Sequence, residues 1–375
     1  MSSPHSDNSS ILGSSSLDSS SLGPLGPIGW DAILDEQFTA HAAAGLMPGR
    51  VSRVDRGRCD VHTTVGVLHA TVPANVLDLP ESGVVTGDWV AIEFGATATV
   101  RAVLPRRTAL YRASADRTSR RQALVANVDT VIVAAALTGA LRPSKIERYL
   151  ALAWDGGTTP VVVLTKSDIA DGHPESAVAD LAAAMPGADV LAVSAYTGDG
   201  LDELRERLGG STVILGPSGV GKSTLVNALV GEQRMDTGAV RAGDDKGRHT
   251  TVTRELIPID GGGVLIDTPG LRGIGLHDAD DGIGQVYADI EALAAQCRFD
   301  DCEHHSEPGC AVQEAIANGT VDAGRLGRYE KMLRESRWAA ARGNAREERR
   351  QRETWKAITR QQRGAYRFRE NNGLR

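Results

Sequence analysis

The segment Gly216–Thr224 constrains the fold of this chain more than any other stretch. It reads Gly-Pro-Ser-Gly-Val-Gly-Lys-Ser-Thr, follows an apolar run at 212–215 and leads into a helical pattern at 225–230. This order of strand, glycine-rich loop and helix is the setting of a phosphate-binding loop. Consecutive backbone N–H groups and the positive end of the helix then face the phosphates of a nucleotide. We therefore predict an α/β nucleotide-binding domain in which Lys222 neutralises the β- and γ-phosphates and Ser223 holds Mg²⁺.

The composition indicates a soluble, cytoplasmic protein of several domains. The 375 residues, 41% of them hydrophobic, can form more than one core. Three of the four cysteines are clustered, which favours a reducing compartment over a disulfide scaffold. The N-terminus lacks a basic region followed by an apolar stretch, and no apolar run approaches the roughly 18 residues of a membrane span. We therefore expect no signal peptide and no membrane partner.

The first 47 residues precede the folded domains. Residues 1–29 are rich in serine, glycine and proline, and we expect a disordered leader because they bury too little apolar surface to become ordered. Residues 30–47 are expected to form a short helical lead-in, whose apolar positions are Ile33, Leu34 and Phe38.

Residues 48–110 contain five or so short β-runs separated by turns, which predicts a small barrel. An OB-type barrel is the natural candidate, although the strand count alone leaves an SH3-like barrel open. Eleven arginines outnumber seven acidic residues between Gly49 and Arg121, which favours contact with a phosphate backbone. Aromatic residues are scarce in this stretch, so we expect binding of shaped RNA rather than stacking on single-stranded bases.

From residue 129 onward, strands alternate with helices, which predicts a parallel sheet covered on both faces. The predicted strands are 131–136, 160–164, 190–195, 212–215 and 264–266. We assign residues 111–280 to this domain.

Polar residues at the ends of these strands have the chemistry of a guanine-nucleotide site. The carboxylate of Asp168 can accept hydrogen bonds from N1–H and the exocyclic amine of guanine, and adenine lacks that amine. The alkyl stem of Lys166 can lie over the base, and the backbone N–H of Ala195 can donate to the guanine O6. Asp267 can reach the Mg²⁺ shell, and Gly270 can offer a backbone N–H to the γ-phosphate.

The sequence thus predicts contacts between GTP or GDP, Mg²⁺ and one set of residues. The set is Thr165, Lys166, Asp168, Ser194, Ala195, Gly216, Pro217, Ser218, Gly219, Val220, Gly221, Lys222, Ser223, Thr224, Thr250, Asp267 and Gly270.

Residues 281–340 are expected to form a mainly helical domain with a metal site. Candidate ligands are Cys297, Cys302, His304 and Cys310. Three thiolates and one imidazole can close a tetrahedron around Zn²⁺ without an open position, which is typical of a structural site. His305 is an alternative fourth ligand, and reduced cysteines without a metal are a further alternative.

The base-reading strands precede the phosphate loop, whereas an ordinary GTPase has them after it. This order resembles that of circularly permuted GTPases, specifically the bacterial family that depends on the small ribosomal subunit. The motifs that resemble signatures of that family are Ala126–Asp129, Gly216–Ser223, Arg248–Thr251 and the cysteine cluster. The resemblance covers about residues 48–340. Its pattern Cys-x4-Cys-x-His-x5-Cys selects His304 over His305.

The resemblance implies a β-barrel, a permuted GTPase domain and a zinc domain in one chain. It also implies hydrolysis of GTP to GDP and phosphate, stimulated by the 30S subunit during its late maturation. The partners would be the subunit and its 16S rRNA, and we expect a monomer. Thr165 stands where Asn is commoner, so we expect weaker hydrogen bonds between the base-reading and phosphate loops. Two alternatives are an RNA chaperone timed by GTP, and an ATPase or small-molecule kinase, against which Asp168 argues.

Catalysis departs from the ordinary GTPase at Leu271, where Gln usually orients the attacking water. Intrinsic turnover should therefore be slow. We predict His249 as the group that replaces Gln, because an imidazole can hold or accept a proton from water near neutral pH. The alternative is that His249 contacts RNA or stabilises its loop. Either Thr250 or Thr251 reaches Mg²⁺, and we favour Thr251.

The C-terminal residues 341–375 are expected to form a basic tail. From Arg325 to Arg375 the chain has 16 lysines and arginines against 6 acidic residues, although its net charge is -7. A basic tail on an acidic body favours a polyanionic partner, and the alternative is a solvated helical face.

Overall fold

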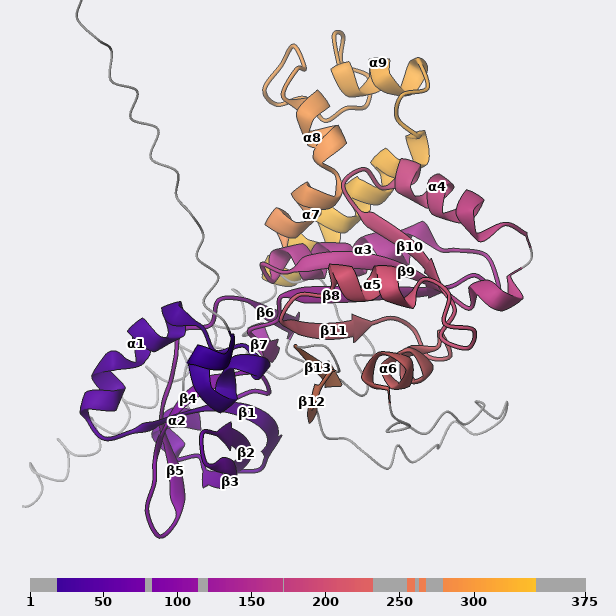
Figure 1. The fold of residues 1–375 in the computed structure, drawn as a ribbon. Coiled ribbons are helices and arrows are strands. Elements are labelled where there is room, and N and C mark those ends of the chain that lie inside the picture. Colours follow the sequence, from indigo (N-terminus) through magenta and orange to yellow (C-terminus); the bar gives the residue numbers. More distant parts are fainter. Residues whose placement is uncertain are drawn as a thin grey trace, which may run out of the picture.

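The computed structural model describes residues 19–77, 83–113, 121–170, 172–231, 255–259, 263–267 and 279–341. Within these ranges the chain forms a small barrel, then a six-stranded sheet with helices on both faces, then a helical C-terminal part (Figure 1). The predicted tail from residue 342 and the first 18 residues lie outside the described residues. Among the helices that the structure describes, none combines the length and apolar character needed to span a membrane.

The barrel is closed by five strands. They are β1 (Met47–Asp55), β2 (Arg58–Thr63), β3 (Gly66–Thr71), β4 (Trp89–Glu93) and β5 (Ala98–Val103), with the short helix α2 (Ala74–Leu77) after β3. Their order around the barrel is β1-β2-β3-β5-β4, with β4 paired to β1 and with β3 parallel to β5. This arrangement confirms the predicted OB-type barrel. Alternate residues of β2, namely Cys59, Val61 and Thr63, are buried.

The end of the predicted leader is ordered, which corrects the expectation for residues 1–29. Residues Ser19–Ile28 form η1, two 3-10 segments separated by a kink at Gly23, and Leu25 and Ile28 are buried against Trp30. The few leucines and isoleucines of this segment therefore bury enough surface because aromatic rings from the next segment complete a small core.

The lead-in helix α1 (Ala32–Ala43) begins at Asp31, whose side chain accepts a hydrogen bond from the backbone N–H of Leu34. Leu34 and Phe38 are four residues apart, lie on one face and are buried. Ile33 was expected to join them but is 57% exposed, because it lies one residue, or about 100°, around the helix from Leu34.

A buried arginine joins the barrel to the sheet. Arg50 of β1 is 1% exposed, and its guanidinium donates to the carbonyl oxygens of Ile28 and Asn127 and to the hydroxyl of Ser211. The same guanidinium lies 5.1 Å from the centroid of the Trp89 ring. Desolvation lowers the pKa of Arg50 to about 10, so the group remains charged at neutral pH.

A two-stranded antiparallel hairpin, β6 (Ala109–Ala113) and β7 (Arg121–Ala126), connects the barrel to the sheet. The predicted domain boundary at residue 110 therefore falls inside a strand. Asn127 follows β7 in the left-handed conformation, with φ 53°. Its side chain donates to the Gly87 carbonyl and accepts from the Arg107 N–H, so it fixes the hairpin to the barrel.

The central sheet has six strands in the order β10-β9-β8-β11-β13-β12. They are β10 (Asp189–Val193), β9 (Thr159–Thr165), β8 (Thr130–Ala136), β11 (Ser211–Leu215), β13 (Val264–Asp267) and β12 (Glu255–Pro258). All neighbours are parallel except β12 with β13. Strand β11, which follows the predicted base-reading loops in the chain, thus lies in the middle of the sheet and leads into the predicted phosphate loop.

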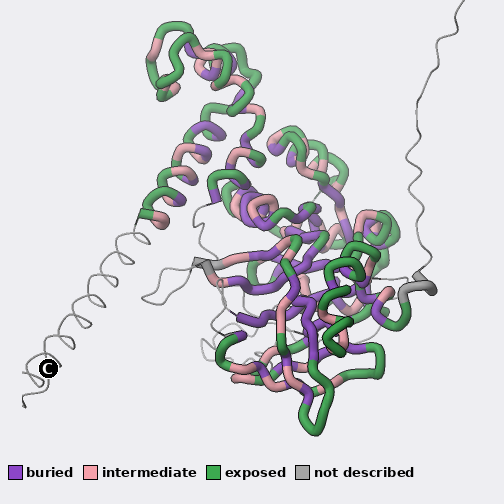
Figure 2. The backbone as a smooth tube through the Cα atoms, turned by 90° about the vertical axis from the view of Figure 1, so that its left-hand side faces the viewer, coloured by how far each residue is buried: buried purple, intermediate pink, exposed green. Residues whose placement is uncertain are grey.

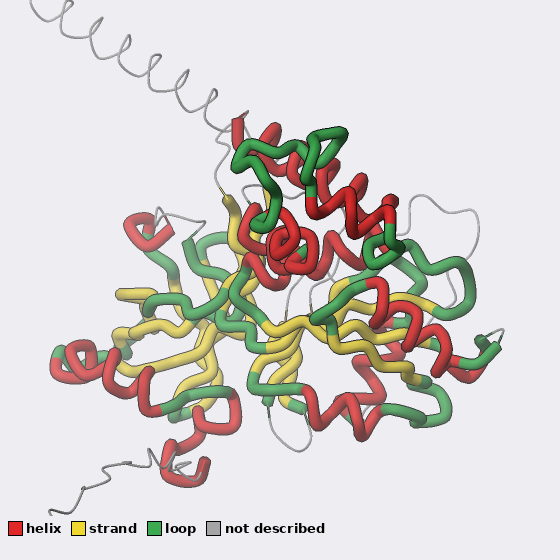
Figure 3. Tube along the Cα trace, turned by 90° about the horizontal axis from the view of Figure 1, so that it is seen from above, coloured by secondary structure: helices red, strands yellow, loops and turns green. Residues whose placement is uncertain are grey.

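Helices cover both faces of this sheet, as the view from above shows (Figure 3). They are α3 (Pro143–Asp155), α4 (Pro174–Ala184), the 3-10 turn η2 (Ser167–Ile169), α5 (Leu201–Arg207) and α6 (Lys222–Val230). Helices α3 and α4 pack with Val131 and Val133 of β8 in one core, whereas α5 and α6 pack with Ile132 and Ala134 in the other. Successive residues of β8 therefore serve opposite faces.

The C-terminal helices extend the core that covers α3. They are α7 (Asp280–Val286), α8 (Ala288–Ala294) and α9 (Ala311–Ala317), followed by a helix at residues 323–341. Helix α7 approaches α3 so closely that a Cβ at Gly282 would lie 2.0 Å from the carbonyl oxygen of Ala151. Figure 2 shows that exposure increases outward, toward the loop between α8 and α9.

Two arginines of the predicted basic end are part of this interface. Arg325 and Arg328 converge on Glu147 of α3, which is fully buried, with N···O distances of 3.4 and 2.9 Å. Arg325 also pairs with Asp289 of α8 at 2.8 Å. These charges are neutralised inside the protein, so the count from Arg325 onward overstates the charge available to a polyanion.

Candidate nucleotide site and metal cluster

The phosphate loop runs from the end of β11 to the start of α6 (Figure 1). Gly216 has φ 153°, and a Cβ there would lie 2.6 Å from the carbonyl oxygen of Ala134, so only glycine fits. Lys222 is the first residue of α6, and its ammonium donates to the carbonyl oxygens of Gly216 at 2.9 Å and Pro217 at 2.7 Å. The charge of Lys222 therefore lies over the loop. Ser223 and Thr224 follow in the first turn of α6.

The loop after β9, which is predicted to read the base, is hydrogen-bonded to the phosphate loop. The hydroxyl of Thr165 lies 2.5 Å from the carbonyl oxygen of Val220 and 3.2 Å from that of Ala135. Lys166 adopts the left-handed conformation, and its ammonium donates to the carbonyl oxygen of Gly219 at 2.9 Å. The hydrogen bonds between the two loops are thus weakened less by Thr165 than we expected. The Thr165 hydroxyl has one proton and donates to one carbonyl oxygen at a time, but this hydrogen bond still connects the two loops.

Ser194 positions Asp168, a role that the sequence did not predict. The buried Ser194 hydroxyl donates to Oδ1 of Asp168 at 2.7 Å and accepts from the backbone N–H groups of Tyr196 and Thr197. The carboxylate that is predicted to read the base and the loop that contains Ala195 are therefore held by one hydroxyl group. The sequence gave no sign of this contact, because Ser194 and Asp168 follow different strands and are far apart in the chain.

The predicted nucleotide residues that the structure describes gather at one edge of the sheet. They follow the carboxyl ends of β9, β10 and β11, and Asp267 is the last residue of β13. The carboxyl ends of parallel strands meet at the same edge, which is where ligands of α/β sheets bind. His249, Thr250, Thr251, Gly270 and Leu271 lie outside the described residues.

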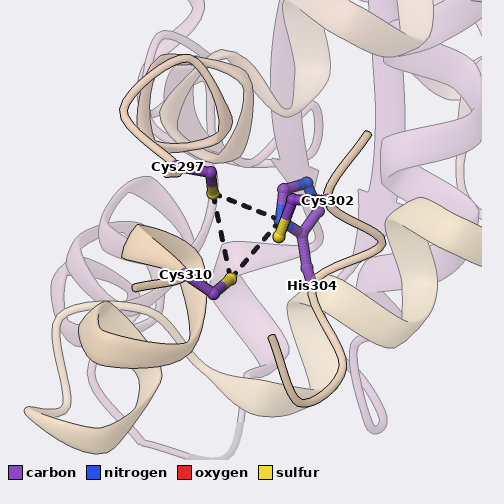
Figure 4. Close-up of side chains that lie close together, drawn as sticks. All are labelled: Cys297, Cys302, His304 and Cys310. Carbon is purple, nitrogen blue, oxygen red and sulfur yellow. Dashed lines mark hydrogen bonds between the residues drawn. The ribbon is translucent and has the colours of Figure 1, made fainter. Parts of the chain in front are cut away.

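Four side chains between α8 and α9 form a cluster that could hold a metal ion (Figure 4). They are Cys297, Cys302, His304 and Cys310, whose ligand atoms all lie within 4.8 Å of one another. Nδ1 of His304 is 3.6 Å from Sγ of Cys297 and 3.5 Å from Sγ of Cys310, and these two sulfur atoms are 3.9 Å apart. A tetrahedron with 2.3 Å metal–sulfur arms has edges of about 3.8 Å, so the spacing fits such an ion.

The loop around the cluster is held by its own hydrogen bonds. The carboxylate of Glu307 accepts from the backbone N–H groups of Glu303, His305 and Ser306, each at 2.9 Å. These bonds lower the pKa of Glu307 to about 2. His305 points away from the cluster, toward Glu330 at 4.0 Å, so the structure brings His304 rather than His305 to the cysteines.

The thiols differ in acidity. Desolvation raises the pKa of Cys302 to about 11, and the neighbouring thiols Cys310 and Cys297 add to the rise. For Cys297, desolvation is outweighed by the backbone N–H groups of Ala311 and Val312, and its pKa is lowered. A bound cation would offset the repulsion between such closely spaced thiolates.

Comparison with known proteins identifies the family. A family model described as RsgA GTPase matches residues 103–277. A small ribosomal subunit biogenesis GTPase RsgA from Streptomyces avermitilis is 50% identical over 342 residues, which cover 90% of this chain and 92% of the relative. The chain belongs to the RsgA GTPase family. A second RsgA, from Streptomyces coelicolor, is 52% identical over 326 residues, which cover 86% of this chain and 89% of that protein.

Solved structures agree with this membership. YjeQ from Thermotoga maritima superposes with a TM-score of 0.59 at 28% identity, over 77% of this chain and 98% of YjeQ. YloQ, described as a circularly permuted GTPase, has a TM-score of 0.56 at 21% identity, over 77% of this chain and 94% of its own. The predicted permuted fold is confirmed, and as an RsgA GTPase the chain is a GTP hydrolase.

Proposed function

We propose that this protein binds the small ribosomal subunit as a monomer in the cytoplasm, contacts 16S rRNA, and hydrolyses GTP to GDP and phosphate during late maturation of the 30S subunit. The proposal further holds that the subunit stimulates hydrolysis. The observation that carries it is 50% identity, over nine tenths of the chain, to a relative named for small-subunit biogenesis.

The nucleotide residues have separate roles in this proposal. Asp168 reads guanine, with Ser194 holding its carboxylate, and Lys222 neutralises the phosphates. Ser223 and Asp267 would hold Mg²⁺, which stabilises negative charge on the phosphates. His249 and Thr251 complete the catalytic set as proposals from the sequence.

Zn²⁺ would be held by Cys297, Cys302, His304 and Cys310, a donor set and spacing that suit it. With four protein ligands the ion has no open position, so its role would be to hold the loop between α8 and α9. Nothing in the hydrolysis of GTP is assigned to it.

The barrel offers a small basic surface for RNA. Five of its arginines are paired within the protein, namely Arg50 in the buried joint, Arg53 with Asp55, Arg101 with Glu93, Arg106 with Asp88 and Arg107 with Asp31. Arg53, Arg56 and Arg58 are exposed around the turn between β1 and β2. We propose that this turn contacts rRNA phosphates.

The test is GTP hydrolysis by the purified protein, with and without purified 30S subunits. Large subunits and ATP serve as controls. We expect strong stimulation by the small subunit alone and none with ATP. No stimulation by either subunit would contradict the proposed partner and leave the GTPase assignment in place.

A further inference from the structure

A cavity of about 270 Å³ lies beside the phosphate loop. It is lined by Pro217–Val220, by the end of β8 and the loop after it, and by the first turns of α3. Asp168 and Ala195 do not line the cavity, but Lys166, which is predicted to lie over the base, does, so the cavity adjoins the predicted base site. It lies on the side of the phosphate loop that faces α3.

The charge of the cavity lining is entirely positive. Arg142, Lys145 and Lys166 line it, and none of the described lining residues is acidic. Lys166 donates to the carbonyl oxygen of Gly219. Arg142 and Lys145 are exposed, and within the described part of the chain their side chains make no ion pair or hydrogen bond. Among the described residues, these two cations therefore lie beside the phosphate loop without a partner.

We propose that Arg142 and Lys145 are catalytic residues, which place positive charge on the phosphates of GTP from the side of α3. The proposal rests on the binding of GTP phosphates in Gly216–Ser223. Ser218 and Gly219 belong both to that loop and to the cavity wall, so the two cations and the phosphates share one short stretch of backbone.

The charge that these residues would stabilise develops during hydrolysis. The oxygen of water forms a bond to the γ-phosphorus while the bond from that phosphorus to the β–γ bridging oxygen breaks. The electron pair of the broken bond stays on GDP, and the proton of water passes to the released phosphate. Negative charge therefore grows on the β-phosphate side, where a nearby cation lowers the barrier more than it strengthens ground-state binding.

The sequence gives a reason why such cations matter in this chain. Leu271 follows the Asp-x-x-Gly stretch, so the usual Gln is absent from that position. Other GTPases obtain a large part of their rate from an arginine supplied in cis or by a partner. Here α3 brings an arginine and a lysine from the chain itself.

The test uses the full-length protein without ribosomes, in single-turnover GTP hydrolysis and in GDP binding by calorimetry. The variants are Arg142→Gln, Lys145→Gln, the double variant, and Arg142→Lys with Lys145→Arg. Lys331→Gln, an exposed lysine on the helix at 323–341, is the matched control. Arg142 gives no side-chain cap to α3, so its replacement removes no bond that the structure shows.

We expect the double variant to hydrolyse GTP roughly 10- to 100-fold more slowly, with a Kd for GDP within about twofold of the parent. Affinity for GDP with aluminium fluoride should fall in parallel with the rate. The charge-preserving variant should keep most of the rate, and Lys331→Gln all of it.

A double variant that keeps its rate would overturn the proposal. So would an equal loss in the charge-preserving variant, because shape rather than charge would then be responsible. If instead Gly216–Ser223 did not bind the phosphates of GTP, Lys222→Ala would leave the affinity for GDP unchanged. That result would distinguish a wrong GTP site from a wrong role for Arg142 and Lys145.

Discussion

At the scale of single residues, one hydroxyl group organises the base-reading part of the site. Ser194 is buried, donates to Asp168 and accepts from two backbone N–H groups of its own loop. An Asp carboxylate that reads guanine has to hold a fixed orientation, because both of its hydrogen bonds to the base are directional. We therefore expect selectivity for guanine to depend on Ser194, a residue that need not touch the base.

Replacing Ser194 by Ala should weaken nucleotide binding. We expect the Kd for GDP to rise about tenfold, since the hydrogen bond that orients Asp168 is lost. The preference for GDP over inosine diphosphate, which lacks the exocyclic amine, should narrow. Calorimetric titration of both nucleotides measures this, with Ser176→Ala as control because that hydroxyl only caps α4 at His173. An unchanged preference would show that Asp168 is oriented without Ser194.

The residues also show what the sequence could and could not predict. Asp168, Lys222 and the cysteine cluster were found because their chemistry lies in short local patterns. Arg50 was missed because an arginine in a strand is usually a surface residue, and its partners are 77 and 161 positions away. Arg142 and Lys145 gave no pattern either, since only the fold places them beside the phosphate loop.

At the scale of elements, α3 is the connection between the nucleotide domain and the C-terminal helices. Its first turns line the cavity beside the phosphate loop, and its middle holds Glu147 against Arg325 and Arg328. The alternation of strands and helices predicted a helix between the first two strands of this domain, and α3 (Pro143–Asp155) lies there. The pattern could not predict that Glu147 in this helix is fully buried, because its burial depends on arginines 178 and 181 residues later.

Removing the Glu147 carboxylate should strongly destabilise the protein. Glu147→Ala removes the buried counterion of Arg328 and one of the two counterions of Arg325, and such a loss typically costs about 3–5 kcal/mol. Urea unfolding followed by tryptophan fluorescence measures the loss. Glu206→Ala on α5 is the control, because that carboxylate is exposed and its removal should change the free energy of unfolding by less than about 0.5 kcal/mol. Similar values for the two variants would contradict a structural role for the ion pairs.

At the scale of the whole molecule, the metal cluster and the nucleotide site are far apart in the fold. Helices α8 and α9 project beyond the face of the sheet that α3 and α4 cover, whereas α6 lies on the opposite face (Figure 1). The two sites are nevertheless in one connected structure, because the core around α3 includes residues of both parts. The order of domains was predictable from sequence patterns, but the continuity of this core was not.

Chelation of the proposed Zn²⁺ should therefore loosen the loop between α8 and α9 and leave the nucleotide site unchanged. We expect faster amide hydrogen exchange in residues 297–317 after treatment with a zinc chelator, because the loop loses its tetrahedral cross-link. The Kd for GDP should stay within about twofold. Cys302→Ser should reproduce the effect, and Ser306→Ala in the same loop should not. An equal loss of nucleotide affinity would show that the two sites depend on each other.

The joint at Arg50 also has a consequence for the order in which a newly made chain can fold. The barrel leaves the ribosome first, but the Ser211 that accepts from Arg50 follows 161 residues later, on the order of ten seconds at bacterial rates of synthesis. Until then the guanidinium lacks this partner, and its complete burial would be costly. The strand that brings Ser211, β11, also carries the phosphate loop. A nascent chain that has gained the ability to bind GTP has therefore already received the strand that anchors its barrel.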